Sequence, residues 1–154
     1  MKTIKSVESV LKEINAPRFH YLKGDAVYEQ IGKTYKLTAT ARFPAIEEYP
    51  SVYDRNKEGI KNSHVNVADS LHAIWNSVHL IFREVKRKSP LAVKVLNERV
   101  YGTIPANTDL EISVLVKDIR NINGKIFSKY NGIISLDGKK LFERSGIGIS
   151  EERL

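Results

Sequence analysis

The sequence predicts an α+β fold in which one long amphipathic helix packs on a largely antiparallel sheet. The first observation is a helical stripe of apolar residues between Val67 and Val85, and the second is the change to period-two alternation after Pro90. The third is the pair of dipeptides Asn123-Gly124 and Asp137-Gly138, which are typical of two-residue hairpin turns. Together they predict a long helix followed by hairpin-connected strands.

Length and composition exclude several classes of protein. The chain has 154 residues without an internal repeat or linker, so we expect a single domain over residues 1–154. It contains no cysteine, which excludes disulfides, a thiol nucleophile and cysteine-ligated zinc or iron–sulfur centres. No apolar run approaches the ~20 residues of a membrane span, and the first ten residues mix charged and apolar side chains too early for a secretory signal. We therefore expect a cytoplasmic protein without a membrane span.

The chain before the long helix is predicted to hold a short helix and one strand. Apolar residues recur at helical spacing at Ile4, Val7, Val10, Leu11 and Ile14. Because Pro17 closes this pattern, we expect an N-terminal helix over residues 1–16. Apolar and polar side chains then alternate, which predicts a half-buried strand over residues 33–43. A long loop, rich in charge, is expected between residues 44 and 63.

The strongest helical pattern predicts a central helix over residues 66–86. Its wide apolar stripe consists of Leu71, Ile74, Val78, Ile81 and Val85, with Trp75 and Phe82 beside them. The opposite face carries polar side chains three and four residues apart, namely Asp69, His72, Asn76, His79 and Arg83. We expect His79 and Arg83 to lie on a solvated surface. The other three lie nearer the start of the helix, where the same face could line a cleft or a dimer interface.

After the helix, alternation predicts antiparallel strands over residues 91–150. The strands are expected at Ala92–Tyr101, Asp109–Ile119, Gly124–Leu136 and Lys139–Ile149. A long helix followed by a run of hairpin strands predicts a curved sheet wrapped around that helix, which is the hotdog arrangement. A cystatin-like or cone-shaped α+β sandwich is the alternative, but those folds usually place more helix before the sheet. Since a sheet of this size leaves an open edge, we expect a homodimer or a dimer of dimers.

Two features of the predicted strands and of the charge bear on partners. The glycines of Gly146-Ile147-Gly148 are expected to let backbone or helix approach the last strand closely. The net charge of +7 favours an acidic partner, such as the phosphates of coenzyme A or an acidic carrier protein. The charge is dispersed, with only Lys86-Arg87-Lys88 forming a run, and no nucleic-acid-binding motif is present. We therefore do not expect nucleic acid as a partner.

Candidate chemistry gathers at Ser63–Asp69, where the long loop becomes the central helix. The first backbone N–H groups of a helix are unpaired and carry partial positive charge, so they can polarise a carbonyl. Asn66 is a good N-cap, and Asp69 three residues later completes something like a capping box. Helix capping alone is thus an equal alternative to catalysis for this pair. His72 and His79 lie seven residues apart and form no known metal motif, so neither a metal nor a cofactor is expected.

The segment His64–Asp69, followed by Trp75-Asn76, resembles the FcoT-like thioesterases, a hotdog family that acts on long-chain fatty-acyl thioesters. Asn66 and Asn76 match the two functional asparagines of that family, and Tyr53 is the counterpart of its functional tyrosine. The spacing from Asn66 to Asn76 is one residue longer than in the family, and an alignment without a gap places Trp75 at that position. One residue turns a helix face by about 100°, so the two alternatives point in different directions. Tyr49 is the alternative tyrosine.

The resemblance implies a thioesterase acting on fatty-acyl-CoA or acyl-carrier protein. In the implied mechanism, Asn66 and Asn76 position the carbonyl and a water, and Asp69 or His64 accepts the proton. His72 and Trp75 are expected to contact the substrate. Two alternatives remain open from the sequence: a hydratase, dehydratase or conjugate-addition enzyme on acyl thioesters, and a dimeric binder of acyl groups without catalysis.

Overall fold

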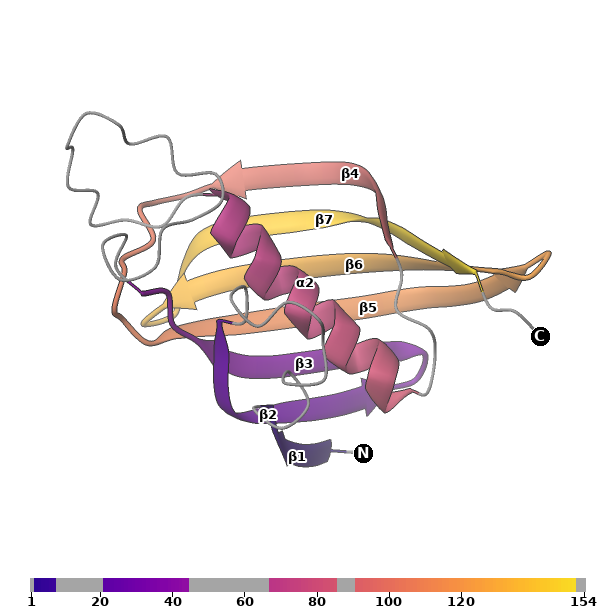
Figure 1. Ribbon diagram of the computed structural model, residues 1–154, viewed down its shortest axis with the longest axis horizontal. Coiled ribbons are helices and arrows are strands. Elements are labelled where there is room, and N and C mark those ends of the chain that lie inside the picture. Colours follow the sequence, from indigo (N-terminus) through magenta and orange to yellow (C-terminus); the bar gives the residue numbers. More distant parts are fainter. Residues whose placement is uncertain (1, 8–20, 45–66, 86–90, 152–154) are drawn as a thin grey trace.

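The computed structural model describes residues 2–7, 21–44, 67–85 and 91–151 (Figure 1). These residues form one helix, α2 (Val67–Glu84), and a seven-stranded sheet. The strands are β1 (Lys2–Ser6), β2 (Leu22–Ile31), β3 (Thr34–Ala41), β4 (Leu91–Val100), β5 (Leu110–Ile122), β6 (Lys125–Leu136) and β7 (Lys139–Glu151). Their order is β1-β2-β3-β5-β6-β7-β4, and every neighbouring pair is antiparallel.

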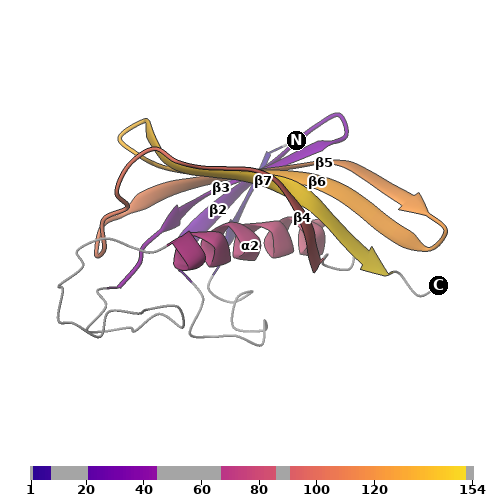
Figure 2. The same ribbon diagram turned by 90° about the horizontal axis from the view of Figure 1, so that it is seen from above.

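The sheet curves around α2, which lies across one of its faces (Figure 2). Alternate residues of the central strands point toward the helix and are buried, among them Leu37, Ile112, Val114, Ile134 and Phe142. From α2 they meet Ile74, Val78, Ile81 and Phe82, all 1% exposed or less. Each such side chain contributes roughly 1.5–3 kcal/mol on burial. The predicted apolar stripe is therefore the helix's contribution to the core, and the expected antiparallel sheet around one helix is confirmed.

The turn dipeptides form the hairpins that they predicted. Asn123 and Gly124 both have positive φ, 54° and 78°, and connect β5 to β6. Asp137 and Gly138 have φ of 50° and 78° and connect β6 to β7. Two successive positive φ angles are what a type I′ turn requires, and its twist matches that of the strands it joins. These turns fix the register of the three longest strands.

The expected N-terminal helix over residues 1–16 is wrong for the part that the structure describes. Residues 2–6 form β1, which pairs with β2 through Thr3 and Tyr28 and through Ile4 and Val27. Two of its five residues are β-branched, and strand pairing satisfies the backbone along the whole segment. Strand β2 was not expected, because outward-facing Val27 and Ile31 blur the period-two pattern. Residues 8–16 lie outside the described part of the chain.

Glycines on β6 and β7 allow close approaches to these strands. A Cβ on Gly132 would lie 2.5 Å from Cγ2 of Ile74, so α2 packs directly on the backbone of β6. A Cβ on Gly146 would collide with the carbonyl oxygen of Lys94 and lie 2.7 Å from the hydroxyl of Tyr130. For Gly146, the expectation of close approach is confirmed.

Candidate active site

Four of the predicted catalytic residues lie before or just after the start of α2 in the sequence. Asp69 is in the first turn of α2, which begins at Val67. His64, Asn66 and Tyr53 lie outside the described residues. The structure therefore establishes the helix that follows the predicted motif, and the roles of these four residues remain predictions.

Asn76 lies in the middle of α2 on the side away from the sheet. It is two residues beyond Ile74, which packs on β6, and this separation turns the helix by about 200°. Despite this position Asn76 is only 7% exposed. A buried amide is held in place by hydrogen bonds, so its rotamer is fixed. Asn76 thus lies on the side of α2 away from the sheet but is shielded from solvent.

Trp75 faces a different direction from Asn76 and packs against the sheet. Its ring centroid lies 5.1 Å from that of Tyr130 on β6 and 5.8 Å from that of His79, one helical turn further along α2. Trp75 and His72 are both half-buried. The two candidates for the second position of the family motif are therefore separated in space: the asparagine lies away from the sheet, and the tryptophan lies toward β6.

His79 does not lie on a fully solvated surface as expected, whereas Arg83 is exposed. Burial lowers the pKa of the His79 imidazole below its ordinary value, because desolvation disfavours the charged ring. A neutral imidazole beside Trp75 is compatible with an apolar ligand surface. The polar stripe predicted from the sequence is thus partly buried.

Tyr130 is a candidate functional residue that sequence reasoning missed. The residue is 3% exposed, and its hydroxyl has no hydrogen-bond partner among the described residues. The hydroxyl lies above Gly146, on the helix-facing side of β7. A buried hydroxyl without a partner is rare and can donate to a bound molecule or a water. The only signal in the sequence was the glycine pair of the last strand, which makes room for this ring.

Arg144 was also missed, although it lies on the same face of the sheet. It pairs with Gly132 across β6 and β7, and directly opposed residues share a face, so Arg144 projects to the side on which Ile74 packs. Its side chain is 13% exposed and its Nη1 lies 3.0 Å from Oε2 of Glu98 on β4. Its Nε is buried without a partner among the described residues. The Nε of Arg144 and the hydroxyl of Tyr130 are therefore two donor atoms on the concave face without a partner among the described residues.

Metal binding finds no support in the described part of the chain, where no three His, Asp or Glu side chains gather in a possible metal site. No helix within the described ranges is long and apolar enough to cross a membrane. Between α2 and the concave face lie an aromatic pair, a half-buried imidazole whose pKa is lowered, and two buried donor atoms without a partner among the described residues. Donors of this kind can orient a carbonyl group that reaches them.

Solved structures with a similar architecture include two that are described as thioesterases. The candidate thioesterase yhdA from Lactococcus lactis matches with a TM-score of 0.59 at 8% identity, over 90% of this chain and 98% of that one. A second thioesterase-superfamily protein matches with a TM-score of 0.50 at 14% identity, over 81% of this chain. This chain spans about half (53%) of the length of that protein.

These likenesses establish the fold, a hotdog-type sheet around one helix. No protein-family model matches the sequence, and no curated protein matches it significantly. The particular family expected from the motif around Asn66 is therefore supported by that motif alone.

Proposed function

We propose that the protein is an acyl-thioester hydrolase of the FcoT-like kind, with fatty-acyl-CoA or acyl-carrier protein as its substrate. The observation that carries the proposal is that α2, the long helix of a thioesterase-type fold, begins at the residue bonded to Asn66. The family motif predicted from the sequence thus includes the first turn of α2, where the backbone amides are unpaired. The net charge of +7 suits the acidic carrier or the phosphates of the coenzyme.

In the proposed reaction, a water attacks the thioester carbonyl while the first backbone amides of α2 hold its oxygen. Asn66 and Asn76 orient the carbonyl and the water, with Tyr53 beside them. Asp69 or His64 takes the proton from the attacking water. The carbon–sulfur bond then breaks, and the same proton goes to the leaving thiolate, so that a free acid and a thiol result. Trp75 and His72 contact the acyl group.

Buried Asn76 supports this proposal better than a solvated asparagine would. An amide that orients a reacting group must not exchange freely with water, and Asn76 is 7% exposed on the helix that carries the motif. Trp75, which occupies the family spacing, faces Tyr130 and would contact the acyl group instead. We therefore assign the orienting role to Asn76 rather than to the residue at the unshifted position.

Mass spectrometry of a panel of saturated and unsaturated acyl thioesters, incubated with the protein, tests the proposal. We expect free acid and free thiol in equal amounts. A product heavier by one water, or by an added nucleophile, with the thioester intact would instead show a hydratase or conjugate-addition enzyme. Unchanged thioesters that nevertheless bind would show a binder without catalysis. Either of the last two results would refute the hydrolase.

A further inference from the structure

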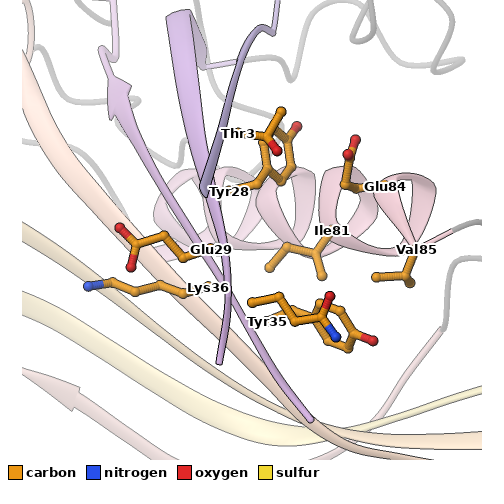
Figure 3. A pocket seen from close by; sticks show the side chains of 9 residues that line it. Thr3, Tyr28, Glu29, Tyr35, Lys36, Ile81, Glu84 and Val85 are labelled. Carbon is orange, nitrogen blue, oxygen red and sulfur yellow. The ribbon is translucent and has the colours of Figure 1, made fainter. Parts of the chain in front are cut away.

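A pocket with a volume of about 220 Å³ opens between the C-terminal end of α2 and the strands β1, β2 and β3 (Figure 3). Its apolar side is formed by Tyr28 and Tyr35 from the strands, by Ile81 from α2 and by Val85 just after it. The polar side chains of the lining are Thr3, Glu29, Gln30, Lys36 and Glu84. The charged ends of Glu29 and Lys36 point away from it (Figure 3). It lies at the opposite end of α2 from the predicted catalytic motif, so the proposed reaction does not use it.

A second hollow adjoins this pocket, because Tyr35 and Val85 line both. It has a volume of about 370 Å³ and is otherwise lined by Lys33, Asp118, Ile119 and Arg120. Lys33 and Arg120 are exposed, and neither forms an ion pair with another described residue. The pocket with the apolar side therefore leads to a rim that carries two cations without an ion-pair partner among the described residues.

The carboxylates near these two hollows already have partners. Both oxygens of Glu84 accept from Nζ of Lys5, at 2.7 and 2.9 Å. Asp118 lies 3.6 Å from Nζ of Lys129. Burial, and then the charge of Glu84, raises the pKa of Tyr28 to about 12, so its phenol stays protonated and acts as a donor. The charges left without a partner at the rim are consequently positive.

From this juxtaposition we propose that the two hollows form one binding site for a small amphiphilic anion. The apolar ring or short chain of the ligand lies between Tyr28, Tyr35 and Ile81, and its carboxylate or phosphate group lies between Lys33 and Arg120. Anions bound by Lys and Arg gain charge-assisted hydrogen bonds, whereas the apolar part gains from leaving water. This site is separate from the proposed hydrolase activity and does not depend on it.

Isothermal titration calorimetry with octanoate, octyl phosphate, octanol and acetate tests the site. We expect octanoate or octyl phosphate to bind more tightly than octanol, which lacks the charge, and than acetate, which lacks the chain. The anion that binds more tightly identifies the headgroup as carboxylate or phosphate. The double variant Lys33→Ala/Arg120→Ala should weaken the binding of that anion by about tenfold or more, and leave octanol unaffected.

Two further variants locate the site. Arg99→Ala/Lys139→Ala removes the same charge from exposed positions elsewhere and should leave all affinities unchanged. Thr3→Phe fills the apolar end of the pocket from the edge strand and should weaken both the anion and octanol. Melting temperatures close to that of the unmodified protein show that each variant is folded. The proposal is overturned if octanol or acetate binds as well as octanoate and octyl phosphate, or if Lys33→Ala/Arg120→Ala binds the anions normally.

Discussion

Gly132 on β6 shows how one missing Cβ sets the distance between helix and sheet. A Cβ at this position would lie 2.5, 2.8 and 3.0 Å from three side-chain carbons of Ile74, which is 0% exposed and has no space to move into. We expect Gly132→Ala to lower the free energy of unfolding by about 1–3 kcal/mol, the usual cost of overpacking. Denaturant unfolding measures it.

The control for this prediction is a double-mutant cycle with Ile74→Ala. Because the truncated side chain no longer meets the new Cβ, Gly132→Ala should cost much less in the Ile74→Ala background than in the unmodified protein. Additive losses would show that the glycine is needed for some reason other than its contact with Ile74.

The burial of His79 leads us to expect that the free energy of unfolding depends on pH. Because its pKa is lowered in the folded protein, the unfolded chain takes up a proton first as the pH falls, and stability is lost from the ordinary histidine pKa downward until the folded ring is protonated as well. We expect His79→Gln to lose less stability than the unmodified protein between pH 7 and pH 5. Thermal melts across this range measure the difference, and parallel pH profiles would contradict the assignment.

At the scale of secondary-structure elements, the sequence predicted best what depends on local pattern. The helix expected over residues 66–86 is observed at Val67–Glu84, because its apolar residues follow a strict helical period. Strands β5, β6 and β7 were found because two turns with local chemistry join them, whereas β4 was found from its alternating pattern. Strand β1 was mistaken for a helix because the three-residue spacing from Ile4 to Val7 fits a helical period. In the structure Ile4 is 63% exposed whereas Val7 is buried, and the segment pairs with β2.

In the turn of the β6–β7 hairpin, backbone strain can be tested at Gly138, where an added side-chain carbon would contact no other residue. A Cβ on Gly138 would meet nothing within 4 Å, but its φ of +78° is unfavourable for any other residue type. We expect Gly138→Ala to cost about 1 kcal/mol or somewhat more through backbone strain alone. Gly138→Asn tolerates this conformation better and should cost less. Equal stability of the alanine variant and the unmodified protein, in thermal melts, would contradict the strain.

The functional residues were less predictable than the fold, because several depend on contacts between distant elements. Tyr130 becomes an unpaired donor only because β7 passes beneath it at Gly146. Arg144 on β7 pairs with Glu98 on β4, its neighbour in the sheet. In the sequence, the whole β5–β6 hairpin separates these two strands. The burial of Asn76 contradicts a purely amphipathic pattern, in which the side opposite the apolar stripe is wet. No short-range pattern reports such contacts.

At the scale of the whole molecule, the two edges of the sheet differ in how they are protected. Edge strand β1 is five residues long, and its Lys2 and Lys5 form ion pairs with Glu29 and Glu84. Edge strand β4 is ten residues long and exposes Val95, Leu96 and Val100, which are 44%, 51% and 61% exposed. A long apolar edge pairs readily with another strand. We therefore expect a homodimer in which β4 lies at the interface.

Sedimentation equilibrium tests this expectation with two matched variants. Leu96→Lys introduces a charge on β4, whereas Ile122→Lys introduces the same charge at the far end of β5, and both side chains are 51% exposed. We expect dimers for the unmodified protein and Ile122→Lys at micromolar concentration, and a shift toward monomer for Leu96→Lys. A monomeric unmodified protein would rule out the dimer, and a dimer that Leu96→Lys leaves intact would rule out β4 as its interface.

The central claim, an acyl-thioester hydrolase whose carbonyl site is at the start of α2, is tested most directly at Asn66. Asp caps a helix about as well as Asn, so Asn66→Asp should retain stability, whereas Asn66→Ala should cost roughly 1 kcal/mol. If the amide donates to the developing oxyanion, Asn66→Asp loses that donor and adds a negative charge, and turnover should fall on the order of 10²–10³-fold or more. The measurement is turnover of an acyl thioester beside the melting temperature of each variant. We expect Asn66→Asp to be stable and nearly inactive; a stable and fully active Asn66→Asp protein would contradict the catalytic site.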